Sequence, residues 1–351
     1  MKNKIIGFGI IGCGDIARSH AEAIRRAPNA TLKAVYDIFP EKAQAFGQKW
    51  GVPAYSDLNK FLDRSDFQAV SICTPSKFHY ETTLTAARAG KHVLTEKPIA
   101  TEVEPAEKMI RVCREEGVKL GVIFQNRFDP VVRKVKQVLE EGVLGQLVMA
   151  DAHLKDFRAP AYYAQADWRG TWATDGGGPI MIQGIHYFDM LLWMAGPVAE
   201  VTAFSARQVH PIEVEDTLVA ALRYRNGALG VVESATNTYA GGANRLELHS
   251  FSGTLILENN RVSKFVTRGP NDRPVDRRPE FGFDQTIEEE WVENHRRQIE
   301  DFADAVRMGR EPAVNGEEGI KVLKVIKTIY KAVRKNHPTA VDPSIWESSR
   351  V

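Results

Sequence analysis

Residues 5–17 read IIGFGIIGCGDIA, and this stretch decides the fold. It begins with an apolar run of strand length and continues into the turn pattern G-x-G-x-x-A. A helical pattern follows as far as residue 26, and a second apolar run, residues 32–36, ends at Asp37. Strand, tight glycine turn, helix, strand and acid in this order are typical of the first half of a doubly wound α/β domain.

Two glycines and the start of the helix make this turn suited to an anion. Gly12 allows the tight turn, and Gly14 lets the backbone approach a pyrophosphate without a Cβ in the way. Asp15 and Ile16 begin the helix, whose first N–H groups and dipole attract negative charge. The pattern therefore predicts a dinucleotide-binding site. A glycine turn that merely packs is the alternative, and it does not account for Asp37.

Asp37 indicates which dinucleotide is bound. Its carboxylate can accept hydrogen bonds from both ribose hydroxyls and would repel a 2′-phosphate, so we expect NAD. NADP is the less favoured alternative, because nearby Lys42 could reach a phosphate.

The composition argues against several classes of partner. The 351 residues include 46 Lys and Arg against 45 Asp and Glu, and the formal net charge of +1 gives no reason to expect nucleic acid or an anionic membrane. No apolar run reaches transmembrane length. Cys13, Cys73 and Cys113 lack metal-ligand spacing, so we expect buried free thiols, no metal site and a reducing compartment, the cytoplasm.

The α/β rhythm continues to residue 124, which predicts a parallel sheet with helical crossovers in a first domain, residues 1–124. Ligands on such a sheet bind at the carboxyl ends of the strands. Thr74 and Lys97 closely follow two of the predicted strands, so we expect both at the site. The further strands are residues 67–73, 92–95 and 118–124.

The pattern changes in residues 125–351. Longer alternating segments predict a mostly antiparallel open sheet, and Asn226-Gly227 between two of them is a strong hairpin signal. Residues 268–280 have the composition of an exposed loop, and two amphipathic helices follow that can pack back on the first domain. We expect an α+β domain whose open sheet face is buried by another subunit, in a homodimer or homotetramer. The four long segments are residues 146–156, 198–208, 216–224 and 228–236.

Two further motifs, taken together with the glycine turn, resemble a known family. They are CTPSKFH at residues 73–79 and AGKHVLTEKP at residues 89–98. Over nearly its whole length the chain resembles the Gfo/Idh/MocA family of NAD(P)-dependent oxidoreductases, and the E-K-P motif is highly specific in this context. The resemblance implies a Rossmann domain followed by an α+β domain. It also implies hydride transfer between a secondary hydroxyl of a sugar, cyclitol or nucleotide-sugar and the nicotinamide of NAD.

The resemblance assigns roles in the first domain. Lys97 would be catalytic, beside the nicotinamide and the reacting hydroxyl. Thr74, Pro75 and His79 would line the cofactor cleft, and Glu96 would contact the nicotinamide side. The residues alone leave Lys97 open, since a lysine at a strand end is more often solvated than functional.

A helix in the second domain is predicted to carry Gln183, His186 and Asp189 on one stripe. Glycines at residues 176–178 precede it and would let a ligand approach. By the resemblance, His186 is the catalytic histidine and Asp189 contacts substrate hydroxyls; by the residues alone, His186 is more often a core histidine. Gln183 is also expected to contact substrate, although it lies about 100° round the helix from residue 182. Many members of the family carry aspartate or asparagine four residues before this histidine, where this chain has Ile182.

Ile182 leaves two alternatives open. The chain could bind NAD and a sugar without oxidising it, as a sensor or partner subunit. It could also hold NAD tightly and recycle it within each turnover, as in some relatives that isomerise or hydrolyse sugars. A positioned acid–base group contributes about 10²–10⁴ in rate, so Lys97 and His186 can still support oxidation without the carboxylate.

Four more residues are expected to contact the substrate. Residues 162–172 resemble the branch of the family that acts on sugars and nucleotide-linked sugars. Arg169 in this stretch, with Arg127 and Arg158 before it, can fork onto hydroxyls, a carboxylate or a phosphate, although each alone is more often a surface or structural arginine. The four residues are Arg127, Arg158, Trp168 and Arg169.

Overall fold

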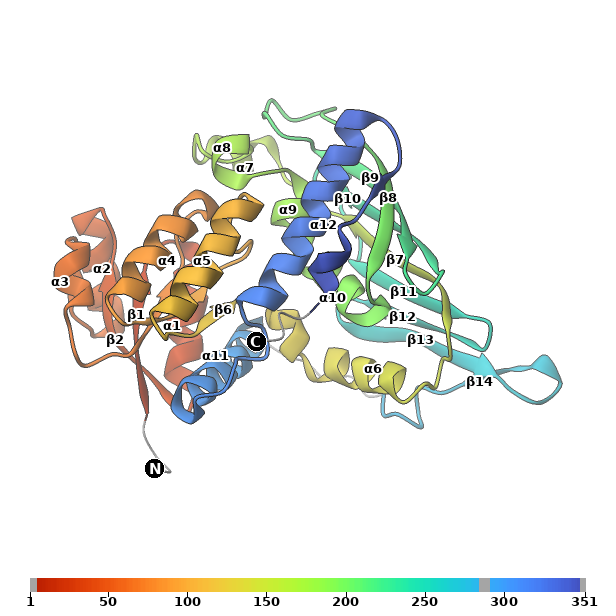
Figure 1. Ribbon diagram of the computed structural model, residues 1–351, viewed down its shortest axis with the longest axis horizontal. Coiled ribbons are helices and arrows are strands. Elements are labelled where there is room, and N and C mark those ends of the chain that lie inside the picture. The colour runs from red at the N-terminus through yellow and green to blue at the C-terminus, as the bar shows by residue number, and fades with distance from the viewer. Residues whose placement is uncertain (1–4, 284–290, 348–351) are drawn as a thin grey trace. The chain divides into compact units, whose positions relative to one another are not determined.

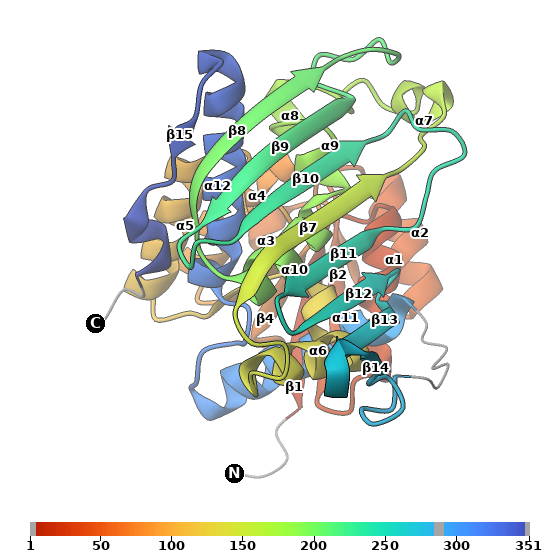
Figure 2. The ribbon, with the colours of Figure 1, turned by 90° about the vertical axis from the view of Figure 1, so that its right-hand side faces the viewer.

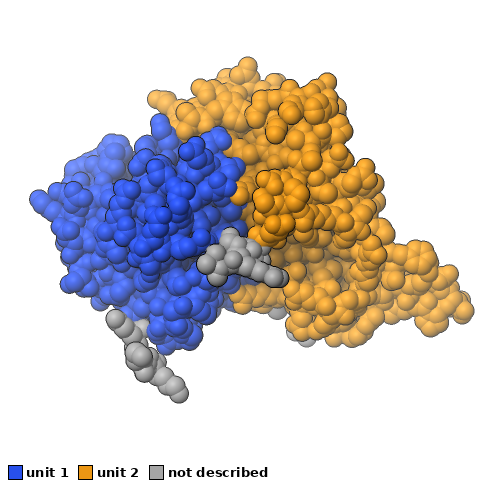
Figure 3. Space-filling model, in the orientation of Figure 1, with its two compact units in different colours: residues 1–128, 289–320 blue, residues 129–288, 321–351 orange. Residues whose placement is uncertain are grey.

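The computed structural model describes residues 5–283 and 291–347, and the chain forms two compact units (Figures 1 and 3). The sequence pattern predicts one boundary after residue 124, whereas in the structure a segment from far along the chain belongs to the first unit. In the described ranges, no helix is long and apolar enough to cross a membrane. Unit 1 comprises Met1–Phe128 and Glu289–Ile320, and unit 2 comprises Asp129–Glu288 and Lys321–Val351.

Unit 1 is built on a parallel sheet of six strands in the order β3-β2-β1-β4-β5-β6. Because β1 pairs with both β2 and β4, this is the doubly wound Rossmann arrangement, and the predicted fold class is confirmed. The edge strand β3 escapes the sequence prediction, since two residues carry no alternating pattern. The strands are β1 (Ile6–Ile11), β2 (Ala30–Tyr36), β3 (Ala54–Tyr55), β4 (Ala69–Ile72), β5 (His92–Thr95) and β6 (Leu120–Val122). The helices are α1 (Asp15–Arg26), α2 (Pro40–Trp50), α3 (Leu58–Leu62), α4 (His79–Arg88), α5 (Val103–Glu115) and α11 (Trp291–Met308), with short turns η1 (Ser76–Phe78) and η2 (Gln125–Phe128).

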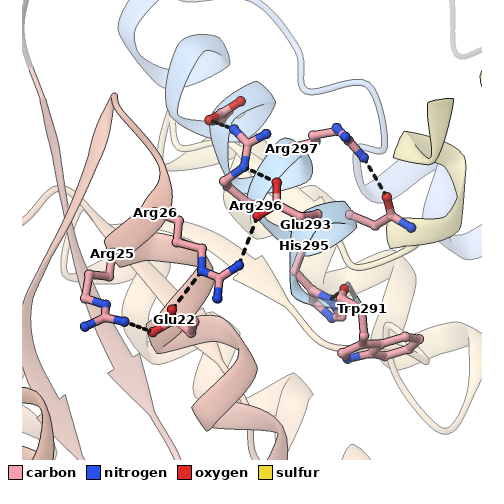
Figure 4. A network of polar contacts seen from close by, with 10 residues as sticks. Glu22, Arg25, Arg26, Trp291, Glu293, His295, Arg296 and Arg297 are labelled. Carbon is pink, nitrogen blue, oxygen red and sulfur yellow. Dashed lines mark hydrogen bonds and ion pairs between the residues drawn. The ribbon is translucent and has the colours of Figure 1, made fainter. Parts of the chain in front are cut away.

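Helix α11 supplies part of the core of unit 1. The ring of Phe302 on α11 lies 6.2 Å from that of Phe8 on β1, centroid to centroid, and both are buried. A Cβ on Gly121 of β6 would come within 2.8 Å of the Phe302 ring, so this close approach requires glycine. At the surface, Arg26 of α1 pairs with Glu293 of α11 at 3.2 Å (Figure 4). The helix is therefore an integral part of this unit.

Unit 2 holds a sheet of nine strands in the order β14-β13-β12-β11-β7-β10-β9-β8-β15. All neighbouring pairs are antiparallel except β7 with β10, which confirms the predicted sheet. Helices α6, α9 and α10 pack on one face, and Figure 2 looks onto the other, over which no described helix lies. The strands are β7 (Leu147–Lys155), β8 (Val198–Ala206), β9 (Thr217–Tyr224), β10 (Leu229–Ala235), β11 (Arg245–Ser250), β12 (Gly253–Glu258), β13 (Arg261–Arg268), β14 (Pro274–Asp276) and β15 (Thr339–Ala340). The helices are α6 (Pro130–Glu140), α7 (Pro160–Ala164), α8 (Trp172–Asp175), α9 (Pro179–Ile182), α10 (Ile185–Ala195) and α12 (Gly316–Lys335), the last of which begins in unit 1.

Two connections in this sheet test the sequence analysis. The predicted hairpin at Asn226-Gly227 joins β9 to β10, with Gly227 at φ +90° and Asn226 Oδ1 accepting a hydrogen bond from Ala228 N at 3.0 Å. The prediction of a loop over residues 268–280 is wrong in part, because β14 pairs with β13. All three residues of β14 are exposed, so no alternation marks this strand in the sequence.

Gly177 and Gly178, in the predicted glycine stretch 176–178, make room for protein atoms. A Cβ on Gly177 would clash with the Tyr330 hydroxyl, and one on Gly178 would clash with the main chain of Glu215. These contacts give the glycines a packing role in place of the expected approach of a ligand. The Glu215 carboxylate closes the turn, since it accepts hydrogen bonds from Gly178 N at 3.2 Å and from the Tyr330 hydroxyl at 2.8 Å.

Glu215→Gln should reduce the dependence of stability on pH. Burial outweighs the hydrogen bonds and raises the pKa of Glu215 from 4.5 to about 7. The folded protein therefore holds this proton more tightly than the unfolded chain, and the free energy of unfolding falls as pH rises through this interval. Glutamine cannot ionise. Over this pH range the free energy of unfolding of the variant should therefore fall by about 3 kcal/mol less than that of the parent protein.

Urea unfolding at about pH 5 and about pH 8 measures this effect. Glu200→Gln on the exposed part of β8 is the matched control and should leave the pH dependence unchanged. Equal slopes in the parent protein and in Glu215→Gln would show that the carboxyl group does not titrate in this way.

Candidate functional site

The glycine turn after β1 contains one glycine that close packing within the protein requires and one that it does not. Gly12 has φ +92°, and a Cβ there would come within 3.0 Å of main-chain atoms of Cys73 and Thr74, so the two loops meet only over glycine. Gly14 has φ −77°, and a Cβ there would meet no described atom within 4 Å. This open space beside the first N–H groups of α1 fits a dinucleotide pyrophosphate.

Asp15 and Ile16 form the first turn of α1. The Asp15 side chain is 85% exposed, whereas Ile16 packs against the core of unit 1. Their main-chain N–H groups are therefore the groups that would face an anion.

Asp37 lies directly after β2 and is buried. Its Oδ2 accepts a hydrogen bond from Cys13 N at 2.8 Å, and its Oδ1 accepts one from Phe39 N at 3.0 Å. These contacts fix the carboxylate against the glycine turn, where its negative charge opposes a 2′-phosphate. Lys42 is close, with Nζ 4.6 Å from the centroid of the Phe39 ring.

The loop after β4 carries Thr74 and Pro75, both half-buried. The Thr74 hydroxyl is buried and has no hydrogen-bond partner in the described part of the chain, as expected of a group that binds a ligand. His79 on α4 is 1% exposed, and burial lowers its pKa. Its Nδ1 lies 2.8 Å from Pro98 O and its Nε2 lies 2.9 Å from Thr74 O, so His79 joins the loops after β4 and β5 from within the protein.

Glu96 follows β5 and takes part in a buried ion pair. Its Oε1 lies 2.8 Å from Nε2 of His20 on α1, and its Oε2 accepts a hydrogen bond from Lys97 N at 3.1 Å. Burial would raise the pKa of Glu96, but the hydrogen bond and charge of His20 hold it well below its usual range. Burial would likewise lower the pKa of His20, but Cys73 and Glu96 raise it to about 10. The Glu96 carboxylate thus faces the protein interior, while Lys97 is half-buried at the strand end.

The sequence analysis does not single out Thr95 or Gln125, which end or follow strands at the same edge of the sheet. Thr95 Oγ1 and both side-chain amide atoms of Gln125 are buried, with no hydrogen-bond partner among the described residues. Unsatisfied buried polar groups at the carboxyl ends of parallel strands are candidates for ligand binding. No motif marks these positions, because an enclosed hydroxyl or amide becomes evident only in the folded chain.

In unit 2, the helix predicted to carry Gln183 and His186 is two helices, α9 and α10. Gln183 lies in the turn between them, so the prediction of one continuous stripe is wrong. A Cβ on Gly184 would come within 2.8 Å of Ser234 Oγ and 3.0 Å of Leu154 Cδ1. The break therefore falls where the chain packs closely on the sheet.

His186 lies in the first turn of α10 and is half-buried. Asp189, nearly one turn later, is 1% exposed. Ile182, in place of the family's carboxylate or amide, is the last residue of α9. Of these side chains, the imidazole is the one suited to proton exchange with a hydroxyl near neutral pH.

The predicted substrate arginines lie in different settings. Arg127, in unit 1, is buried and pairs at 3.0 Å with a glutamate in the first turn of α12. In unit 2, the guanidinium carbons of Arg158 and Arg169 lie 5.5 and 4.3 Å from the centroid of the Tyr162 ring. The Trp168 ring lies 5.4 Å from the Arg169 guanidinium. Unit 2 thus brings together three of the four predicted residues.

Several known proteins are similar to this chain over most of its length. The myo-inositol 2-dehydrogenase of Thermotoga maritima is 28% identical, covering 96% of this chain and 99% of its own. The D-glucoside 3-dehydrogenase of Escherichia coli is 30% identical over 67% and 71% of the two chains. The crystal structure of the WlbA dehydrogenase from Bordetella pertussis, in complex with NADH and UDP-GlcNAcA, has a TM-score of 0.88 at 31% identity, covering 97% of this chain and 99% of that one.

The family comparison assigns both halves of the sequence. Residues 6–124 match the Gfo/Idh/MocA oxidoreductase family with its NAD-binding Rossmann fold, and residues 132–256 match the Gfo/Idh/MocA C-terminal domain. The glycine turn, the E-K-P segment and the two sheets agree with these matches. The resemblance predicted from the motifs is confirmed: this protein belongs to the Gfo/Idh/MocA family of oxidoreductases.

Proposed function

We propose that this protein is an NAD-dependent oxidoreductase acting on a secondary hydroxyl of a sugar, cyclitol or nucleotide-sugar. The likeness to the WlbA dehydrogenase, at 31% identity over 97% of the chain, carries the proposal. The open space at Gly14 and the fixed carboxylate of Asp37 support NAD as the cofactor, which when bound would accept the hydride. The cysteines Cys13, Cys73 and Cys113 are free, which supports a cytoplasmic location.

Lys97 and His186 are proposed to handle the hydroxyl proton. The Lys97 ammonium, at the carboxyl end of β5, can stabilise negative charge that develops on the hydroxyl oxygen. The His186 imidazole can accept the proton. Ile182 can do neither, and Gln183 and Asp189 are proposed to contact other hydroxyls. A non-catalytic sensor and a recycled cofactor are less favoured, because the relatives described above are dehydrogenases.

Arg158 and Arg169, both stacked on Tyr162, are proposed to contact the substrate. Arg158 pairs with Asp156 at 2.8 Å, whereas Arg169 is held by neutral oxygen atoms. The group therefore carries more positive than negative charge and suits a sugar carboxylate or a phosphate. The adjacent Trp168 is 39% exposed and offers an aromatic face to a sugar ring.

The outward face of the nine-stranded sheet is proposed to join subunits into a homodimer or homotetramer. Phe204 on β8 pairs directly with Val219 on β9, and Leu229 on β10 pairs with Met149 on β7. These four apolar side chains are between 44% and 69% exposed. Exposed apolar pairs on an open sheet face are typical of a surface that a partner covers, and charged residues such as Glu233, which pairs with Val219, lie beside them on this face.

Lys97→Ala should lower kcat by about 10²–10⁴, because a positioned acid–base group is removed. Affinity for NAD should stay close to that of the parent protein, since the glycine turn is untouched. Turnover is followed by reduced-nicotinamide absorbance, with the best substrate from a panel of sugars, cyclitols and nucleotide-sugars, and NAD binding by calorimetry. Lys108→Ala on α5 is the control. Unchanged turnover in Lys97→Ala would remove this lysine from the mechanism.

Gly14→Val should abolish NAD binding while lowering the thermal melting temperature of the ligand-free protein by at most a few degrees, the effect of replacing the N-cap glycine of α1. The branched side chain would fill the space beside the α1 N-terminus, but it meets no described protein atom there. Gly242→Val is the matched control, since a Cβ at that position lies 3.8 Å from Lys155 O, an ordinary contact distance. Calorimetric titration with NAD measures the effect, and parental affinity in Gly14→Val would place the pyrophosphate elsewhere.

The double substitution Phe204→Glu and Val219→Glu should convert the oligomer to monomers, because burying two unpaired charges in a subunit interface is costly. Light scattering after size-exclusion chromatography gives the mass. Met308→Glu, at an exposed position of unit 1, should leave the assembly unchanged. An oligomer that persists in the double variant would exclude this face as the interface.

A further inference from the structure

Lys97 lies in a segment that is otherwise enclosed. Within residues 93–100, all of which the structure describes, Lys97 is the one residue that is not buried. The residue before it, Glu96, and the residue after it, Pro98, each contact a buried histidine on a different helix. The main chain of Lys97 is therefore held from both sides.

The Glu96 side of the segment is tied to α1. His20 is 0% exposed, and its two ring nitrogens lie 2.8 Å from Glu96 Oε1 and 2.6 Å from Ser71 Oγ. Glu96 N donates to Ile72 O at 3.0 Å, and the other carboxylate oxygen accepts from Lys97 N at 3.1 Å. One carboxylate thus connects the helix after the glycine turn to the amide of Lys97.

His295 on α11 contacts the His20 ring edge-on, with ring centroids 5.4 Å apart, and it also lies close to Glu96, since the ligand atoms of all three side chains are within 4.8 Å of one another. Figure 4 shows His295 beside Trp291, whose carbonyl oxygen lies 3.2 Å from His295 Nδ1. Burial and the charge of His20 lower the pKa of His295 to about 4. His295 is therefore neutral at physiological pH, and the positive charge that faces Glu96 from the helices is that of His20.

The Pro98 side of the segment is tied to α4. His79 places its Nδ1 2.8 Å from Pro98 O and its Nε2 2.9 Å from Thr74 O. Because burial lowers the pKa of His79, the neutral ring carries one N–H and donates to one of these carbonyl oxygens, while it lies against the other, between the loops that follow β4 and β5. Movement of Pro98 would break the contact with His79.

A metal ion is the other occupant that this cluster could suit. His20, Glu96 and His295 offer potential ligand atoms within 4.8 Å of one another. A metal needs a lone pair on a His20 nitrogen. Both His20 nitrogens already lie within hydrogen-bond distance of Ser71 and Glu96, so the geometry favours the ion pair.

We propose that His20, Glu96 and His79 are positioning residues that fix the main chain around Lys97. They present its ammonium in one orientation at the end of β5, while Lys97 alone contacts the reacting group. The inference rests on the proposed catalytic role of Lys97. It attributes the fixed position of the Lys97 ammonium to buried side chains. A displacement of about 1 Å at a reacting group can cost about 10²-fold in rate, so loss of these contacts should be visible in kcat.

Two substitutions of Glu96 separate positioning from charge. In Glu96→Gln, the amide oxygen can accept from Lys97 N, and the amide nitrogen can donate to a neutral His20. The pair stays uncharged overall, and at most one hydrogen bond is weakened. Because such a loss is small, kcat should remain within about 10-fold of the parent value. Glu96→Ala removes both contacts and should lower kcat by about 10²-fold, with the dissociation constant for NAD unchanged.

The histidines provide a second comparison. His20→Ala and His79→Ala should each lower kcat in the manner of Glu96→Ala. His92→Ala is the matched control, because His92 stands at the other end of β5 and accepts a hydrogen bond from Lys119 N at 2.9 Å. It removes a partly enclosed histidine from the same strand, so kcat should not change.

Hydrogen exchange at the Lys97 amide tests the positioning independently of turnover. Nuclear magnetic resonance resolves the Lys97 amide individually, and its exchange reports on the bond from Lys97 N to Glu96 Oε2. We expect protection in the parent and in Glu96→Gln, and its loss in Glu96→Ala. If the parent protein oxidises no sugar, the proposed function is wrong. The exchange measurement would still test whether Glu96 holds the main chain of Lys97.

Three results would overturn the positioning inference. The first is parental kcat in Glu96→Ala when its Lys97 amide has lost protection. The second is a Glu96→Gln variant as slow as Glu96→Ala, since the charge would then matter more than the contacts. The third is one equivalent of metal in the purified parent protein that is lost in His20→Ala.

Discussion

The buried pairing of His20 with Glu96 connects the parts of unit 1 that matter most to its chemistry. His20 belongs to the helix that begins at the glycine turn, and Glu96 precedes the lysine of the E-K-P motif. The two residues are 76 positions apart in sequence and 2.8 Å apart in the fold. Removing one partner of a buried pair typically costs about 3–5 kcal/mol, because the other charge is left uncompensated. The pair is tolerated here because Ser71 and the Lys97 amide satisfy its remaining hydrogen bonds.

Unit 2 uses a buried carboxylate in a related way. Glu215 receives hydrogen bonds from Gly178 and Tyr330 immediately before α9, the short helix that leads to His186. In each unit a buried acid accepts hydrogen bonds from the main chain: Glu96 from Lys97 itself, and Glu215 from Gly178, before the short helix that precedes His186. The two carboxylates differ in how their negative charge is compensated. Glu96 faces a cation, whereas Glu215 is held by neutral donors and its pKa is raised. The two carboxylates are therefore in opposite charge states over part of the neutral range.

The sequence predicts the fold where a local pattern repeats. The glycine turn, the parallel strands of unit 1 and the long alternating strands of unit 2 follow from periodicity and turn chemistry. The break at Gly184 does not, since it depends on close packing against Ser234 on a strand fifty residues away. The glycines before α9 are a second case. A glycine leaves space beside the main chain, and the sequence does not indicate whether a ligand or a side chain such as that of a tyrosine fills this space; the fold does.

In the candidate site, too, the setting of some residues could be predicted from the sequence and that of others could not. Gly12, Gly14, Asp37 and Lys97 stand at strand ends that the α/β pattern defines, so their setting could be predicted. The motif also includes His79 and Glu96, but the structure turns both side chains into the protein, where they contact His20 and the neighbouring main chain. Such contacts join residues far apart in sequence and carry no local pattern.

The return of α11 to unit 1 has a consequence for synthesis on the ribosome. Ile299, Phe302 and Ala303 complete the same hydrophobic core as β1 and α1, although almost three hundred residues separate the two contributions. The nascent Rossmann sheet must therefore emerge from the exit tunnel with one side of its apolar interior uncovered, and it stays so while all of unit 2 up to β14 is translated. Closure of the nucleotide-binding half must therefore wait until α11 has been translated, and a chaperone has its longest opportunity to bind during that interval.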